Sequence, residues 1–251
     1  MKRRVLRANY AGWVARGSPS FAGHLRSNFG ILVKGVLSPA ESGSFAKIVR
    51  KARSEWTPDF GGEQFTLGSA FYTHLETGRS RDYFEAASAS DRRVERFLPG
   101  LQARMRSLLG AFLGGSVRPR YGFCGAGVHV FPRDAAVAKR GGVVHFDVEG
   151  LAPAHLSAEL ATATLVLMLQ PATFGGGLRV YDAMYHGREE PTPRQCASAY
   201  ETVRYEAGDA FLMASTRLHQ IRPFRGPRDR ISATLHAVQV DAKERVWESW
   251  F

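Results

Sequence analysis

The sequence predicts an α+β protein, with helices concentrated in its first half and an antiparallel β-barrel or sandwich in its second. Between residues 80 and 113, apolar side chains recur mostly at three- and four-residue spacing, which is the pattern of amphipathic helices. After Pro119, short β-branched and apolar runs follow one another with little helical pattern between them. Because the helical segments come first, we expect them to pack on the outside of one sheet.

The first part of the chain, residues 1–117, is expected to form a helical support for the barrel. A short apolar run at residues 31–36 is typical of a strand. Ser38 as N-cap, Pro39 at the first helical position and Glu41 at the third predict the start of a helix that runs to about residue 53. The apolar stripe of residues 80–113 should form one or two helices, broken at Pro99-Gly100, and its function is core packing.

The second part, residues 118–251, is expected to form the β-barrel core. Gly, Pro or Asp separates many of its eight candidate strands. These candidates are residues 127–131, 142–145, 163–169, 178–181, 202–205, 210–213, 219–224 and 231–240. The chain has no internal repeat and no low-complexity linker, so residues 1–251 are expected to form a single domain.

The composition indicates a globular protein with a surplus of positive charge. Lys and Arg number 34 against 23 Asp and Glu, a net charge of +11 that favours anionic partners. Cys124 and Cys196 form no CxxC pair, which argues against a disulfide scaffold or a thiolate zinc site and suits a reducing compartment. The longest apolar run is too short to cross a bilayer, and the basic start lacks the apolar stretch of a signal peptide. We therefore expect a cytoplasmic location and no membrane partner.

The segment His145-Phe146-Asp147 is the strongest candidate for chemistry. In an extended strand, residues i and i+2 point the same way, so His145 and Asp147 should present an imidazole and a carboxylate on one face. A third ligand from another strand would complete the two-histidine, one-carboxylate face that holds non-haem Fe(II). His219 lies 72 residues beyond Asp147 and is the candidate for that ligand. Arg230 follows eleven residues later and can bind a carboxylate in a bidentate manner.

This order of residues resembles that of the Fe(II)/2-oxoglutarate-dependent dioxygenases, which have HxD, a distal His and R-x-S. The segments Phe174-Gly-Gly-Gly-Leu-Arg-Val-Tyr181 and Glu206-Ala-Gly-Asp209 are similar to the family's GG-x-L strand and to its turn before the distal His. More narrowly, the chain is similar to the free-standing natural-product halogenases and hydroxylases of bacteria, typified by the indole-alkaloid halogenases. The halogenases have Gly or Ala at the position of Asp147, so the carboxylate here favours hydroxylation over halogenation.

The resemblance implies a double-stranded β-helix, or jelly-roll, core and a defined set of cofactors. These cofactors are Fe(II), 2-oxoglutarate and O2, and 2-oxoglutarate would be converted to succinate and CO2 as the substrate is oxidised. In this reading three side chains bind the iron, and three others hold the distal carboxylate of 2-oxoglutarate. The iron ligands are His145, Asp147 and His219, and the 2-oxoglutarate residues are Arg230, Ser232 and Thr164.

Substrate-binding residues are suggested by position in the family. Tyr72 and His74, in the segment before the long helices, are candidates for the pocket, and Phe146 is a third. His129, on the strand before HxD, can face the barrel, although a packed histidine is the more common outcome. A basic run beside the distal His is either a solvated rim or a positively charged mouth for an anionic substrate. This run consists of Arg217, Arg222, Arg225 and Arg228.

The leading interpretation is therefore a hydroxylase of an unactivated C–H bond in a free small molecule, such as an amino acid, a nucleotide or an alkaloid. A nucleic-acid dealkylase of the same chemistry is an alternative. That group carries a second Arg six residues after the first, whereas this chain has His236 there, which makes a nucleic-acid partner unlikely. A non-catalytic β-barrel binding protein is the remaining alternative.

Overall fold

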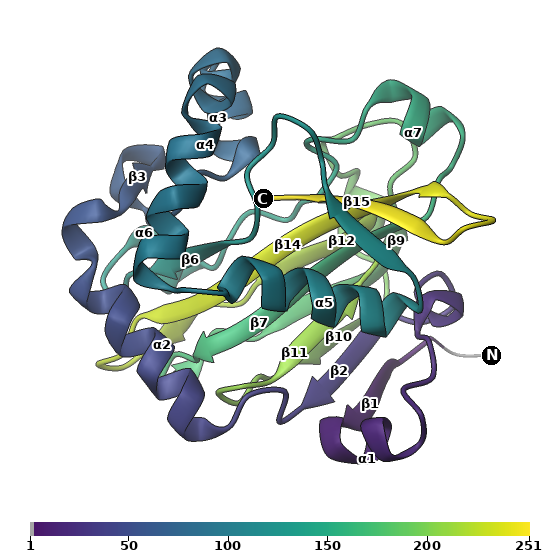
Figure 1. Ribbon diagram of the computed structural model, residues 1–251, viewed down its shortest axis with the longest axis horizontal. Helices are drawn as coiled ribbons and strands as arrows, with labels where there is room; N and C mark the ends of the chain where they lie inside the picture. Colours follow the sequence, from purple (N-terminus) through teal and green to yellow (C-terminus); the bar gives the residue numbers. More distant parts are fainter. Residues whose placement is uncertain (1–2) are drawn as a thin grey trace.

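Two β-sheets face each other in the computed structural model, which describes residues 3–251, and helices cover the outer face of the larger sheet (Figure 1). The larger sheet has the strand order β1-β2-β11-β7-β14-β6-β4-β3, and β15 and β5 extend it beside β14. Its strands are β1 Val5–Asn9, β2 Gly30–Lys34, β3 Thr57–Asp59, β4 Gln64–Leu67, β5 Ser116–Pro119, β6 Gly127–Phe131, β7 Thr162–Gln170, β11 Ala210–Met213, β14 Arg230–Asp241 and β15 Val246–Trp250.

The smaller sheet has the order β10-β9-β12. A separate two-stranded ribbon pairs β8, which precedes β9 in the chain, with β13, which follows β12. The strands of the smaller sheet are β9 Leu178–Met184, β10 Tyr200–Val203 and β12 Arg217–Ile221, and the ribbon consists of β8 Phe174–Gly175 and β13 Phe224–Arg225. The α-helices are α1 Tyr10–Ala15, α2 Pro39–Lys51, α3 Phe71–Glu76, α4 Ser80–Phe97, α5 Leu101–Leu113, α6 Ala136–Arg140, α7 Pro153–Ser157 and α8 Pro193–Cys196. None of the helices in residues 3–251 combines the length and apolarity needed to cross a membrane.

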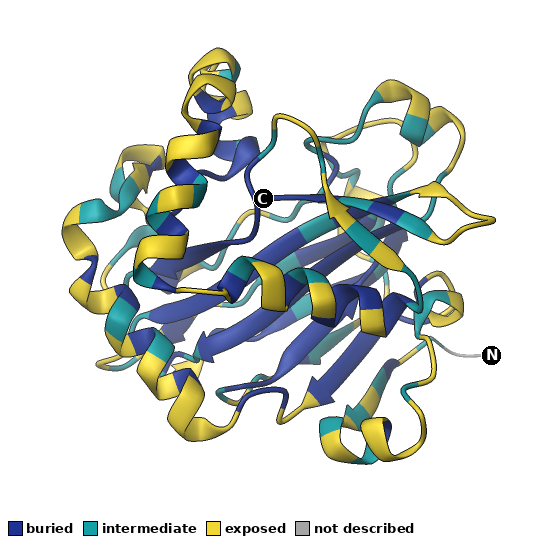
Figure 2. Cartoon of the chain, viewed as in Figure 1, coloured by how far each residue is buried: buried dark blue, intermediate teal, exposed yellow. Residues whose placement is uncertain are grey.

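The long central strand β14 separates the hydrophobic core from the interior between the sheets. Its odd-numbered residues, from Ile231 to Ala237, are fully buried against α2, α4 and α5. Its even-numbered residues point to the other face, because successive side chains of a strand alternate. The same alternation holds on β7, where Leu165 and Leu167 face the helices and Thr164 faces the interior. Figure 2 shows the resulting buried central sheet under partly exposed helices.

The helical predictions are confirmed. Ser38 caps α2: its hydroxyl accepts from the Glu41 N–H at 3.2 Å, while the Glu41 carboxylate accepts from the Ser38 N–H at 2.8 Å. The stripe of residues 80–113 forms α4 and α5, which are separated at Leu98–Gly100, where Gly100 takes φ of 76°. The apolar side chains of α5 lie in the core, as expected.

Most of the predicted strands are also present, and the α+β double-stranded β-helix class is confirmed. One candidate differs: residues 142–145 form only a single bridge, from His145 to His219, within the described part of the chain. The segment runs beside β12, whose own pairing with β9 shifts register between Arg217 and His219. Residues 3–117 contain strands β1 to β4 and the start of β5 as well as helices. All five strands belong to the larger sheet, so this part of the chain contributes strands as well as helices.

A buried carboxylate at the end of β3 makes the stability of this fold depend on pH. Asp59 is 1% exposed, and neither of its oxygens has a hydrogen-bond partner among residues 3–251. Burial raises its pKa to about 6 from 3.8, and the nearby hydroxyls of Thr73 and Thr66 oppose this rise only in part. The folded state therefore binds more protons than the unfolded state between these values, and stability is lost as the pH rises through about 6.

We predict that Asp59→Asn stabilises the protein at pH 7.5 by on the order of 2 kcal/mol, because it removes an uncompensated buried charge. At pH 4 the difference between the variant and the natural protein should nearly vanish, since Asp59 is then protonated in the folded state. Urea unfolding of both proteins at the two pH values measures this. A variant that is less stable at pH 7.5 would contradict the assignment.

Candidate metal centre and cavity

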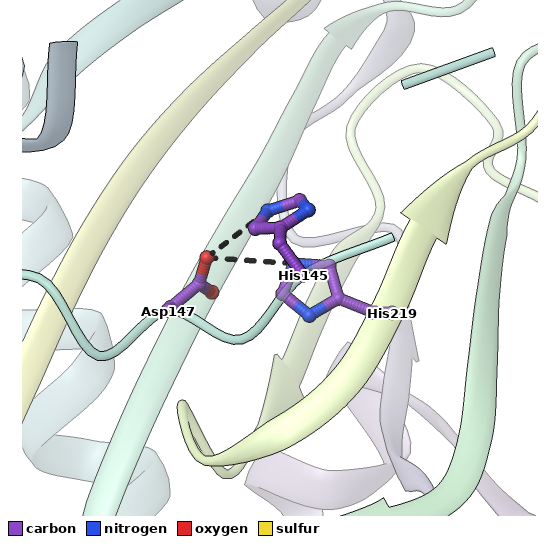
Figure 3. A group of neighbouring side chains, drawn as sticks. All are labelled: His145, Asp147 and His219. Carbon is purple, nitrogen blue, oxygen red and sulfur yellow. Dashed lines mark ion pairs between the residues drawn. The ribbon is translucent and has the colours of Figure 1, made fainter. Parts of the chain in front are cut away.

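Two imidazoles and a carboxylate converge between the two sheets. One possible ligand atom from each of His145, Asp147 and His219 lies within 4.8 Å of the other two. The Nε2 atoms of His145 and His219 are each 3.4 Å from Oδ1 of Asp147 (Figure 3). His219 stands on β12, and the other two residues stand on the segment beside it, where the Asp147 N–H donates to the Ser215 carbonyl at 2.9 Å. The predicted cluster is therefore assembled from separate parts of the chain.

The hydrogen bonds of both imidazoles prepare them to bind a metal ion. His145 Nδ1 is 2.9 Å from the Val143 carbonyl oxygen, and His219 Nδ1 is 2.9 Å from that of Arg217. A carbonyl oxygen only accepts, so each Nδ1 carries the proton and donates it. In the neutral form of each ring the lone pair is then on Nε2, beside Asp147, which is the form and the orientation of a metal-binding histidine. The donor set fits a divalent metal ion that keeps open positions for other ligands.

The electrostatics of the cluster favour a cation at its centre. Burial alone would raise the pKa of Asp147, but His219, His145 and His236 hold it well below its usual value. For His145 the effects are reversed: burial alone would lower its pKa, but the hydrogen bond with Asp147 and the charge of that carboxylate raise it to about 9. The Asp147 carboxylate is thus ionised, and it attracts positive charge to the Nε2 atoms. A metal ion bound at Nε2 can take the place of the proton that His145 otherwise carries there.

The second carboxylate oxygen of Asp147 accepts a hydrogen bond from Thr164, so Thr164 contacts a predicted metal ligand, a role that the sequence did not indicate. The Thr164 hydroxyl donates to Asp147 Oδ2 at 2.8 Å and also lies 2.9 Å from Ser215 Oγ and 3.0 Å from His236 Nδ1. Sequence reasoning missed Ser215 and His236. Side chains alternate between the two faces of a strand, so His236 lies on the same face of β14 as Arg230 and Ser232. This pattern would have identified His236 as a cavity residue.

Arg230 is a buried cation without an acidic partner. It is 3% exposed, its Nη1 donates to Ser232 Oγ at 3.2 Å, and its Nε donates to the Gly176 carbonyl at 3.2 Å. Burial lowers its pKa, and Tyr205 opposes this; no carboxylate of residues 3–251 forms an ion pair with it. A buried guanidinium without an acidic partner is strongly stabilised by an anionic ligand. Its planar arrangement of N–H donors suits a carboxylate. Ser232 lies beside it as predicted.

A cavity of about 680 Å³ joins the metal cluster to Arg230 and Ser232. Tyr72 lines this cavity, and the Gln64 amide donates to its hydroxyl. His129 lines it too: this side chain is 7% exposed, and burial lowers its pKa to about 3, so the ring is neutral. Large apolar side chains form most of the remaining wall. They include Phe60, Phe71, Phe131, Val143, Trp250 and Phe251.

Two predicted substrate residues lie elsewhere in the described chain. His74 is 6% exposed and packs its ring against Tyr83, while its Nδ1 lies 2.9 Å from the Ala70 carbonyl oxygen. The reason is that α3 turns Tyr72 and Glu76 toward the cavity and His74 toward α4. Phe146 is 1% exposed in an apolar cluster with Leu218, on the face opposite its two neighbours. Neither His74 nor Phe146 lines the cavity in the part of the chain that the structure describes.

None of the four arginines of the basic run beside His219 is in the cavity lining that the structure describes. Arg217 is fully buried and donates to the carbonyls of Tyr181 and Arg26. The other three members of the run, Arg222, Arg225 and Arg228, lie outside the lining.

Several carboxylates line the cavity instead. Glu63 pairs with Arg140 at 3.3 Å. Burial, together with the neighbouring Asp147, raises the pKa of Glu149 to about 7. Burial also raises the pKa of Glu76, and His145 partly offsets this.

Solved structures share this fold at low sequence identity. One is the non-heme alpha ketoglutarate dependent carbocyclase SnoK from nogalamycin biosynthesis, with a TM-score of 0.60 and 15% identity over 88% of this chain and 83% of that one. Another is the epimerase SnoN in complex with Fe3+, alpha ketoglutarate and nogalamycin RO, with a TM-score of 0.57 and 16% identity over 89% and 82% of the two chains. No family model and no curated protein matches the sequence. The similarity establishes the shared fold.

The hydrogen bond from Thr164 to Asp147 yields a direct test of the metal centre. We predict that Thr164→Val lowers the affinity for Co(II) about 10- to 100-fold, because outer-shell partners of metal ligands typically contribute that much. Isothermal titration calorimetry with Co(II) measures the affinity. Thr234→Val is the matched control, since Thr234 is also buried on the cavity wall but makes no side-chain hydrogen bond in the described chain. Equal affinities of the two variants would refute this role of Thr164.

Proposed function

We propose that this protein is an Fe(II)- and 2-oxoglutarate-dependent oxygenase. The observation that carries the proposal is the content of one cavity: three ligand atoms of His145, Asp147 and His219 within 4.8 Å of one another, and the buried Arg230 without an acidic partner among residues 3–251. A metal ion and a dicarboxylic acid satisfy both features at once. The fold shared with SnoK and SnoN, whose names include alpha ketoglutarate, supports the same reading.

Each part of the site would have a separate task. His145, Asp147 and His219 hold the iron on one side and leave the cavity side open, while Arg230 and Ser232 bind the distal carboxylate of 2-oxoglutarate. When bound, iron and 2-oxoglutarate supply the oxidising power of O2, with conversion of 2-oxoglutarate to succinate and CO2. Thr164 keeps the Asp147 carboxylate oriented. The apolar wall excludes water and positions one C–H bond of the substrate.

We further propose hydroxylation of a free small molecule as the reaction, in bacterial natural-product biosynthesis and in the cytoplasm. The Asp147 carboxylate supports hydroxylation, because it fills the metal position that halogenases leave to chloride. The cavity of about 680 Å³ suits a small molecule. SnoK is named as an enzyme of nogalamycin biosynthesis, and SnoN was crystallised with nogalamycin RO. Both names support a natural-product substrate. One catalytic domain would span residues 1–251.

Anaerobic spectroscopy tests the proposed class. We predict that Fe(II) and 2-oxoglutarate together give the weak metal-to-ligand charge-transfer band of a chelated keto acid, and that His219→Ala abolishes this band by removing a ligand. His186→Ala serves as the control, because His186 is exposed and lies outside the cavity lining. A flat spectrum from correctly folded protein, with no succinate formed after O2 is added, would favour a non-catalytic binding protein.

Arg230 tests the cosubstrate site. We predict that Arg230→Ala raises the 2-oxoglutarate concentration needed for half-maximal succinate formation on the order of a hundredfold, because a buried charge-assisted pair is lost. The exposed Arg228 offers the matched control, and Arg228→Ala should leave the requirement unchanged. An unchanged requirement in Arg230→Ala would move the cosubstrate site elsewhere.

A further inference from the structure

Arg217 is a buried cation that the proposed chemistry does not use. Its side chain is fully buried, and arginine is almost never fully buried unless it is paired. The nearby Asp182 forms its ion pair with Arg3 instead. The guanidinium of Arg217 donates to two backbone carbonyls, those of Tyr181 at 3.3 Å and Arg26 at 3.2 Å. Because removing such a charge from water is costly, these two contacts call for an explanation beyond packing.

The first contact lies at a gap in the ladder between β12 and β9. Arg217 pairs with Met184 of β9. Two residues later, His219 pairs with Val180 and not with residue 182. Three residues of β9 therefore lie opposite a single residue of β12, and such a bulge interrupts the regular hydrogen bonds between strands. Tyr181 belongs to the bulged stretch, so the guanidinium joins the two strands at the point where their backbones do not.

The second contact ties the same strand to the segment before β2. Arg217 Nη2 donates to the Arg26 carbonyl, and its Cζ lies 5.9 Å from the ring centroid of Phe29. A guanidinium directs several N–H donors outward in one plane, so one side chain can bridge two carbonyls. The start of β12 is thereby fixed both to β9 and to the segment that leads into β2.

The part of the chain that Arg217 fixes holds the whole metal cluster. The carbonyl of Arg217 accepts from His219 Nδ1 at 2.9 Å, which turns His219 Nε2 toward Asp147. His219 also exchanges two backbone hydrogen bonds of 3.0 Å with His145. The Ser215 carbonyl accepts from the Asp147 N–H at 2.9 Å. All three predicted ligands (Figure 3) are therefore attached to residues 215–219, and a displacement of this segment would move each of them.

We propose that Arg217 is a positioning residue of the metal centre, whose guanidinium holds the start of β12 in the bulged register that orients the imidazole of His219. Arg217 does not line the cavity, so it acts through the backbone and through His219. This inference rests on the proposed function, because it gives Arg217 a task at the metal centre of that function. A purely structural role would change the stability of the fold without setting the affinity of the cluster for a metal ion.

Arg217→Met tests the proposal, because methionine fills most of the same apolar space but cannot donate to the two carbonyls. We expect its affinity for Co(II), measured by calorimetry, to fall about tenfold, the lower end of the effect of outer partners of metal ligands. Arg217→Lys keeps the charge but not the planar set of donors, so it should lose about threefold. Urea unfolding shows whether each variant is folded, and Arg217→Lys decides the question if Arg217→Met does not fold.

Val49→Ala is the control for a general loss of stability. Val49 is fully buried in the core between the helices and the larger sheet, whereas β12 belongs to the smaller sheet. The substitution leaves a cavity and destabilises the fold, but it should leave the Co(II) affinity unchanged.

Proton NMR of the Co(II)-loaded protein gives a second measurement that is independent of affinity. A histidine bound through Nε2 has an exchangeable Nδ1–H signal that Co(II) shifts far outside the usual range, so we expect two such signals. The more slowly exchanging one should belong to His219, whose side chain is 6% exposed against 40% for His145. In Arg217→Met this proton should exchange faster, because its carbonyl acceptor is no longer held in place. The His145 proton, bonded to the Val143 carbonyl, should not change.

Unchanged Co(II) affinity in a folded Arg217 variant, an unchanged His219 signal, or an equal loss of affinity in Val49→Ala would overturn the inference. The natural protein tests the proposed function separately. If it binds no Co(II), the proposed function falls and the inference with it, whereas a result confined to the Arg217 variants decides the inference alone.

Discussion

The contact of the Asp147 carboxylate with two imidazoles is the interaction on which the rest of the site depends. One oxygen faces Nε2 of His145 and of His219, and the other accepts from Thr164 on the central sheet. This carboxylate therefore connects the larger sheet, strand β12 and the segment beside it. It stays ionised despite burial because positive or polar groups surround it, and that charge gives the cluster its affinity for a cation.

Strand β14 distributes the side chains that make such a site possible. One face supplies apolar residues to the helices, and the other supplies Arg230, Ser232 and His236 to the cavity. A shift of one residue in the pairing with β7 would exchange the two faces, so the packing of the core also fixes the positions of the functional groups. The stability of the sheet and the geometry of the site are thus set by the same register.

The sequence predicted the elements whose signals are local. The cap at Ser38 and the break at Pro99-Gly100 depend on neighbouring residues only, and the spacing of His145 and Asp147 needs only an extended backbone. It failed where a side chain's surroundings come from distant segments. Thr164 contacts Asp147 because β7 passes under the metal cluster, and Phe146 packs against Leu218 across two segments. Net charge alone does not place positive charge in the cavity: Arg222, Arg225 and Arg228 lie outside the described lining, whereas Arg230 is part of it.

The most direct test of the central claim is the position of the metal ion. Crystals grown anaerobically with Fe(II) and 2-oxoglutarate allow iron to be located by anomalous diffraction at its absorption edge. The account predicts one anomalous peak per chain, within bonding distance of Nε2 of His145, Nε2 of His219 and a carboxylate oxygen of Asp147. A peak at other residues, or the absence of any peak from protein with an intact fold, would contradict it.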